Sequence, residues 1–197
     1  MNVNDKISME YEARVMISES DYRKIYDRFL NSGGICRVFT NKNTYLDTPD
    51  LYLTHHHAVL RIREIDDIEK ELTLKIKGEK GDIEITHQIK DEQEYQELLK
   101  GKITDKEIIK EIELRGGNVS TLKVVATLIT ERMEVPFFTH LLVIDKNYYN
   151  DKIDYNLEVE STSRIEADKY LKVLTSEYNI EYKEDYISKS RRAILKL

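Results

Sequence analysis

Alternating apolar and charged side chains mark the first predicted strand of the chain. Between Met9 and Val15, Glu10, Glu12 and Arg14 fall on one side of an extended backbone, and the apolar side chains fall on the other. Taken alone, this pattern is typical of a strand with one buried and one solvated face. Comparable alternation or strand-like composition recurs at residues 35–47, 60–65, 72–77, 82–89, 122–136, 137–147 and 152–161. The chain is therefore predicted to form about eight strands.

Helical periodicity interrupts these strands after the first, the fifth and the last. Ser18 caps a helix whose apolar stripe ends at Gly33-Gly34, residues 91–115 hold two helical stretches, and Ser163 opens a capping box. The basic stretch at residues 188–193 is also compatible with a helix. Short turns between consecutive strands predict an antiparallel meander, and eight such strands can close into a barrel. The predicted fold is thus α+β, an eight-stranded antiparallel closed β-barrel with flanking helices.

Composition narrows the class of protein. The 197 residues suit a single domain spanning 1–197, and a hydrophobic content of 40% is enough for a core. The net charge of −6 argues against general nucleic-acid binding, and the single cysteine, Cys36, excludes an internal disulfide. The sequence shows neither a leader nor an apolar run that could span a membrane, so we expect a cytoplasmic protein. His55-His56-His57 could bind metal adventitiously, but three adjacent side chains on a strand cannot face one way, which favours a plain loop or the entry to a strand.

The charges are sorted by strand. Two predicted strands carry acidic pairs, Glu10 with Glu12 and Glu158 with Glu160, and two others carry basic pairs. A solvated face usually mixes signs, because like charges two residues apart repel each other. Paired carboxylates suit a hard divalent cation, Mg²⁺ or Mn²⁺, and clustered Arg and Lys suit phosphate oxygens. Together they indicate a metal-bound polyphosphate.

An ordered set of motifs then resembles the CYTH superfamily, the triphosphate tunnel metalloenzymes. The motifs are Glu10-x-Glu12-x-Arg14, Tyr45-x-Asp47-Thr48-Pro49, Leu60-Arg61-Ile62-Arg63, Leu72-Thr73-Leu74-Lys75-x-Lys77, Arg132, Asp145, Glu158-x-Glu160 and Ser188-Lys189-x-x-Arg192. Each motif is weak alone, but their order spans nearly the whole chain. The length and a helical insertion at about 91–121 are most similar to the CYTH proteins of Gram-positive bacteria.

The resemblance implies a barrel whose charged faces point inward, into a tunnel that binds a triphosphate-containing small molecule. By position, the metal ligands would be Glu10, Glu12, Asp145, Glu158 and Glu160. The phosphate path would be lined by Arg14, Arg61, Arg63, Lys75, Lys77, Arg132, Lys189 and Arg192. Tyr45 and Lys75 match a catalytic pair of the thiamine triphosphatase branch, and Glu84 matches a commonly acidic position.

Arg14 departs from the pattern, because the family usually has Lys at this position. Arginine keeps the positive charge but does not readily lose its proton, so a phosphate clamp fits it better than a proton-transfer role. The leading prediction is a divalent-metal-dependent triphosphatase. A class IV-like adenylate cyclase, a non-catalytic polyphosphate-binding module and an ordinary β protein with solvated strand faces are the alternatives. The sequence leaves the oligomeric state open, a homodimer included.

Overall fold

The computed structural model describes the backbone of residues 6–78 and 82–197 and the side chains of residues 11–78 and 82–197. The strands are β1 (Lys6–Ile17), β2 (Arg37–Asp47), β3 (Ala58–Ile65), β4 (Glu69–Ile76), β5 (Asp82–Gln88), β6 (Lys123–Phe137), β7 (His140–Tyr149) and β8 (Lys152–Ser161). The helices are α1 (Glu19–Asn31), α2 (Tyr52–His55), α3 (Glu92–Leu99), α4 (Lys106–Leu114), α5 (Arg164–Glu177) and α6 (Lys189–Leu195). A 3-10 turn, η1 (Val119–Thr121), precedes β6.

The strands follow the order of a barrel, β1-β5-β4-β3-β2-β6-β7-β8, in which β1 also pairs with β8. The registers of β1–β8, β3–β4, β4–β5, β6–β7 and β7–β8 are all antiparallel. The predicted α+β fold with an eight-stranded antiparallel barrel is therefore confirmed. The simple meander is wrong at two points, because β1 lies beside β5 and not β2, and β6 lies beside β2 and not β5. The 13-residue helix α1 connects β1 to β2, and a connection of this length does not require the two strands to pair.

The predicted helix starts are confirmed, and one short helix was missed. The hydroxyls of Ser18 and Ser163 accept hydrogen bonds from the amides of Asp21 and Glu166 at the starts of α1 and α5. The missed helix, α2, ends at His55, so the three histidines lie at a helix end and in the following turn. In the described parts of the chain, no helix is both long and apolar enough to cross a membrane.

The chain divides into two compact units. Unit 1 comprises Met1–Met9, Lys42–Leu128 and Lys189–Leu197, and unit 2 comprises Glu10–Asn41 and Ile129–Ser188. The extent of the domain as a single 1–197 body stays a prediction.

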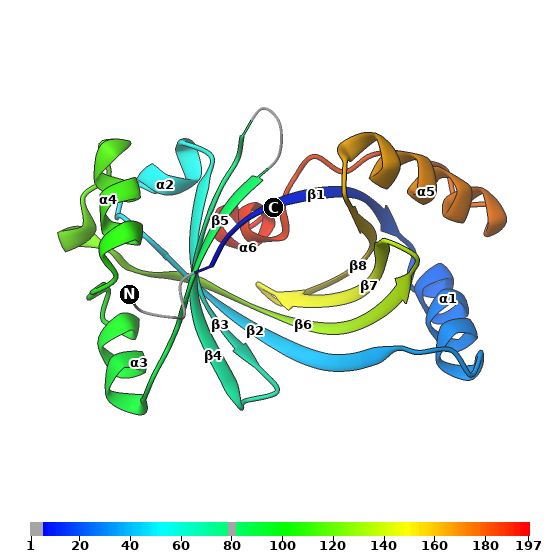
Figure 1. Cartoon of the computed structure of the whole chain (residues 1–197), viewed down its shortest axis with the longest axis horizontal. Helices are drawn as coiled ribbons and strands as arrows, with labels where there is room; N and C mark the ends of the chain where they lie inside the picture. The colour runs from blue at the N-terminus through cyan, green and yellow to red at the C-terminus, as the bar shows by residue number, and fades with distance from the viewer. Residues whose placement is uncertain (1–5, 79–81) are drawn as a thin grey trace. The chain divides into compact units, whose positions relative to one another are not determined.

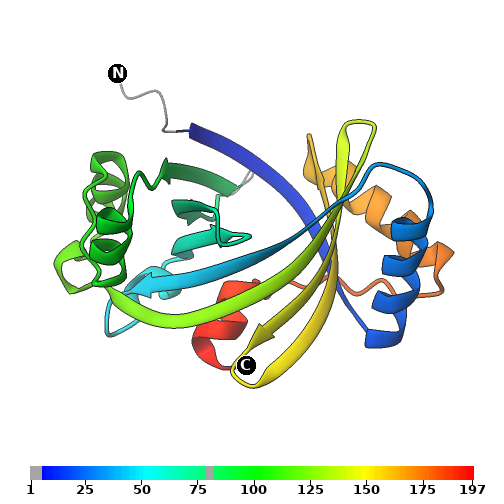
Figure 2. The ribbon, with the colours of Figure 1, turned by 90° about the horizontal axis from the view of Figure 1, so that it is seen from below.

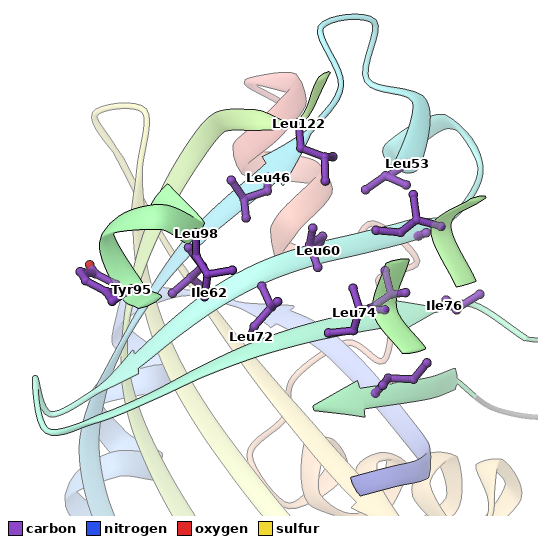
Figure 3. Packing of buried hydrophobic residues seen from close by; sticks show 14 residues of the cluster. Leu46, Leu53, Leu60, Ile62, Leu72, Leu74, Ile76, Tyr95, Leu98 and Leu122 are labelled. Carbon is purple, nitrogen blue, oxygen red and sulfur yellow. The ribbon is translucent and has the colours of Figure 1, made fainter. Parts of the chain in front are cut away.

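Helices α3 and α4 cover the apolar face of the β3–β5 sheet in unit 1 (Figure 1). Leu60 and Ile62 of β3 and Leu72 and Leu74 of β4 are each 1% exposed or less. They belong to the same cluster as side chains of α3, among them Leu98 (Figure 3). Because side chains alternate along a strand, the odd-numbered residues of β3 and β4 point to the opposite face.

In unit 2, too, helices pack against the apolar face of the strands. Figure 2 shows β6, β7 and β8 side by side, with α1 and α5 beside them. Ala13 and Val15 of β1 pack in one cluster with Ile25 of α1 and with Ala167 and Leu171 of α5. The charged residues of β1 and β8 alternate with these apolar ones, so they occupy the strand face that the helices do not cover.

Candidate functional site

A glutamate–arginine cluster occupies the polar strand face of unit 2. Cross-strand register places Glu12 opposite Glu160, Arg14 opposite Glu158, and Arg132 opposite Asp145. Residues directly opposite each other share a face of the sheet. The structure thus brings together on one face these six predicted site residues, which come from β1, β6, β7 and β8.

Glu158 is held between two arginines. Its Oε1 accepts a hydrogen bond from Arg14 Nη1 at 3.1 Å, and its Oε2 accepts one from Arg132 Nη2 at 3.4 Å. With 1% of its surface exposed, Glu158 cannot be an ordinary solvated strand residue. Burial lowers the pKa of both guanidiniums, but the carboxylates around them, Glu158 included, outweigh it and hold each pKa above its ordinary value. Both arginines are therefore permanent cations within an acidic cluster.

Asp145 forms a buried ion pair with Arg132. Its two oxygens accept hydrogen bonds from Nε and Nη2 of Arg132, each at 2.9 Å, in a two-pronged pair. The side chain is fully buried, and Oδ2 also faces the amide of Asn156 at 3.5 Å. Asn156 in turn accepts a hydrogen bond from Asn147 at 2.8 Å. Asp145 thus fixes the orientation of Arg132, while its predicted role as a metal ligand stays a prediction.

A second group of charges, the Arg61–Lys75 cluster, lies on the polar strand face of unit 1. Glu84 Oε1 is 3.6 Å from both Arg61 Nη2 and Lys75 Nζ. The cross-strand pairing of Lys75 with Glu84 sets this geometry. Arg63 Nη1 lies 3.5 Å from Glu71 Oε1. These basic side chains are between one-sixth and one-fifth exposed, so solvent ions and small anions can reach them.

The remaining predicted phosphate ligands and the predicted catalytic tyrosine also belong to unit 1. Tyr45 is buried on β2, two residues after Asn43, whose Oδ1 accepts a hydrogen bond from Arg63 Nε at 3.3 Å. Lys77 was expected on a strand face, but β4 ends at Ile76 and Lys77 is exposed just beyond it. Arg192 is buried in α6, and Lys189 is the first residue of that helix.

The donor chemistry of the glutamate–arginine cluster suits a hard cation, since every carboxylate in it offers oxygen atoms alone. Glu12 and Glu160 are each about a quarter exposed at the side chain, 26%, so an ion can reach them. The side chain of Glu10 lies outside the described residues. Among the described residues, no group of three or more His, Cys, Asp or Glu side chains is arranged as a metal site.

Among the described residues, four acidic neighbours of the two clusters were not predicted. One is Asp82, whose Oδ2 lies 3.4 Å from Lys75 Nζ. Glu134 lies 3.9 Å from Arg132, and Glu71 lies close to Arg63. Both could have been found by extending the alternation of β6 and β4 by two residues. Asp185, which bonds to Arg14 Nε at 3.2 Å, lies in the irregular stretch after α5, where no periodicity marks a functional position.

The chain is similar to known proteins along nearly its whole length. A sequence model described as the CYTH domain matches residues 8–193. A protein named "Putative triphosphatase YjbK" from Bacillus subtilis is 25% identical over 177 residues, covering 89% of this chain and 90% of the relative.

Solved structures share the fold. A crystal structure titled as a "putative adenylate cyclase" from Bacillus halodurans has a TM-score of 0.81 at 23% identity, covering 92% of this chain and 96% of that one. The structure of the "putative adenylyl cyclase HpAC1" from Hippeastrum, a protein described as having a dominant triphosphatase activity, has a TM-score of 0.76 at 20% identity. It covers 93% of this chain and 94% of its own.

Proposed function

Because this chain belongs to the CYTH domain family, we propose that it is a divalent-metal-dependent hydrolase of triphosphate substrates, with inorganic tripolyphosphate or an organic or nucleoside triphosphate as substrate. The observation that carries the proposal is a buried ion-pair cluster on the polar face of unit 2, in which strand carboxylates such as Glu158 are paired with Arg14 and Arg132. Burying a carboxylate such as Glu158 is costly unless it is paired. The presence of buried Glu158 between two arginines therefore supports the proposal that this face binds charged ligands.

The Arg61–Lys75 cluster is the proposed phosphate-binding group. The guanidiniums of Arg61 and Arg63 can donate two parallel hydrogen bonds to phosphate oxygens, and Lys75 acts as a point charge. Glu84, at 3.6 Å from Arg61 and from Lys75, holds both in place before substrate binds. In hydrolysis these cations would stabilise the negative charge that develops on the transferred phosphoryl group. Lys189, Arg192 and Lys77 are proposed as further phosphate ligands, and Tyr45 with Lys75 as the pair that assists proton transfer.

The metal ligands are proposed to be Glu10, Glu12, Glu158 and Glu160, with Asp145 as a further candidate. A bound Mg²⁺ or Mn²⁺ would supply charge neutralisation and polarise the phosphate oxygens. The chain's own part is to present carboxylate oxygens and to hold them in place, which Arg14 and Arg132 do for Glu158 through ion pairs of 3.1 and 3.4 Å.

The test is phosphate release from tripolyphosphate with Mg²⁺, with Mn²⁺ and with EDTA. We expect metal-dependent turnover that falls at least about 100-fold in Glu12→Gln and in Lys75→Met, the scale of losing one charge-stabilising group. Glu107→Gln and Lys110→Met make the same charge changes on the exposed surface of α4 and should keep wild-type rates. Tight binding of tripolyphosphate without turnover would replace the hydrolase by a binding module, and cyclic AMP formed from ATP would replace it by a cyclase.

A further inference from the structure

Arg14 belongs to the glutamate–arginine cluster, and it also binds the Glu184–Ile187 segment, which is distant in sequence, to β1. Its Nε donates to Asp185 Oδ2 at 3.2 Å, and its Nη2 donates to the carbonyl oxygen of Ile187 at 3.1 Å. In the reverse direction, the amide of Asp185 donates to the carbonyl oxygen of Arg14 at 2.9 Å. The Glu184–Ile187 segment is thus held by both the side chain and the backbone of one residue.

Neighbouring contacts keep the same segment against β1. Glu184 forms an isolated antiparallel bridge with Val15, and it is paired with Arg164 of α5. Arg164 also donates to the carbonyl oxygen of Glu12, so it spans from β1 to Glu184. Within the segment, the amide of Ile187 donates to Asp185 Oδ1 at 3.0 Å, which orients the carboxylate toward Arg14.

The geometry requires arginine. The three nitrogens of the Arg14 guanidinium have different acceptors: Nε bonds to Asp185, Nη2 to Ile187, and Nη1 to Glu158 at 3.1 Å. A lysine has a single nitrogen at the end of its chain and cannot reach acceptors on three sides of a planar fork. This explains why Arg14 stands where the resemblance leads one to expect Lys.

We propose that Arg14 is a positioning residue that, with Asp185 as its partner, holds the Glu184–Ile187 segment on β1. This segment leads directly into α6, which begins at Lys189 and contains Arg192. Holding it restricts the conformations open to the chain immediately before two proposed phosphate ligands. The consequence for triphosphate binding rests on the proposed function, whereas the holding of the segment does not.

Replacement of Asp185 separates this role from direct phosphate binding by Arg14. Asp185→Asn removes a negative charge 3.2 Å from Arg14 Nε. If Arg14 bound phosphate directly, the loss of a competing carboxylate would tighten tripolyphosphate binding. If Arg14 and Asp185 hold the segment, the same change weakens binding although the protein becomes less negative.

Hydrogen exchange tests the holding itself without any ligand. Mass spectrometry of the peptide containing residues 184–187 should show exchange about tenfold faster in Arg14→Lys and in Asp185→Asn than in wild type, as expected for loss of one charge-assisted hydrogen bond. Asp27→Asn, which removes an equal charge from an exposed position of α1, should leave the exchange unchanged. Calorimetry with tripolyphosphate should show weaker binding in both variants and wild-type binding in the control.

The two readouts fail separately. Unchanged exchange at residues 184–187 in both variants would overturn the positioning role, whatever the binding result. Tighter tripolyphosphate binding by Asp185→Asn would also overturn it, in favour of a direct phosphate contact by Arg14. If exchange at residues 184–187 is faster in both variants but the wild-type protein binds no tripolyphosphate, the proposed function is refuted. The role of Arg14 in holding the segment on β1 would then stand.

Discussion

Replacing Asp145 by Asn measures how strongly the glutamate–arginine cluster depends on its deepest pair. The carboxylate is fully buried and accepts two hydrogen bonds of 2.9 Å from Arg132. A hydrogen bond to a charged group contributes about 1.5–3 kcal/mol, and breaking a buried ion pair by removing one partner costs about 3–5 kcal/mol. Asparagine keeps one acceptor of similar shape, so we expect the free energy of unfolding to fall by about 3 kcal/mol.

Urea unfolding in the presence of EDTA measures this loss without a contribution from bound cations. Asp27→Asn is the control, since it changes the same charge at an exposed site. A double-mutant cycle with Arg132→Met should give a coupling energy of about 2–3 kcal/mol, because the two residues act as one pair. A loss below about 1 kcal/mol in Asp145→Asn would refute the reasoning. It would mean that Asp145 is a carboxylate kept for a metal and not for Arg132.

Two further outcomes follow from the structure. Burial raises the pKa of Glu64, but hydrogen bonds from Lys42 and Tyr95 outweigh it and lower that pKa below its usual value. A carboxyl with a lowered pKa stabilises the fold above its unfolded pKa of about 4.3 and loses this as pH falls, so between about pH 5 and pH 3 wild type should lose more unfolding free energy than Glu64→Gln. Gly101→Ala should cost about 3 kcal/mol in urea unfolding, because the residue has a φ of +81° and its Cβ would lie 1.9 Å from a backbone oxygen. Gly33→Ala, with a φ of +71° but no atom within 4 Å of the new Cβ, should cost only about 1 kcal/mol.

Period-two alternation predicted the strands well because the apolar side of each strand is covered by helices. Ala13 and Val15 pack under α1 and α5, and Leu60 and Ile62 pack under α3. Their charged neighbours on the same strands therefore had to share the other face, as expected from the sequence. The strand order was harder to predict, since nothing in β1 itself shows that it lies beside β5 instead of β2.

Partners from irregular segments could not be predicted. Asp185 has no periodic context, and only the folded path of residues 184–187 brings it to Arg14. The same holds for Arg164, which a helix pattern places on α5 but which reaches a carbonyl oxygen of β1. Cross-strand partners are set by register and can be inferred from alternation, whereas partners in connecting segments depend on tertiary structure alone.

The charge balance of the glutamate–arginine cluster adds a physical reason for it to bind cations. Among the side chains that the structure describes, six carboxylates lie within 4.0 Å of the guanidinium of Arg14 or Arg132, the two arginines of the cluster. They belong to Glu12, Glu134, Asp145, Glu158, Glu160 and Asp185. Two of the six, Asp145 and Glu158, are almost fully removed from solvent, so water screens their repulsion poorly. The two arginines are already shared among several acceptors and cannot offset the excess negative charge. A divalent cation near the more exposed Glu12 and Glu160 would offset this excess negative charge. The same excess of carboxylates therefore gives a physical reason for the proposed metal dependence.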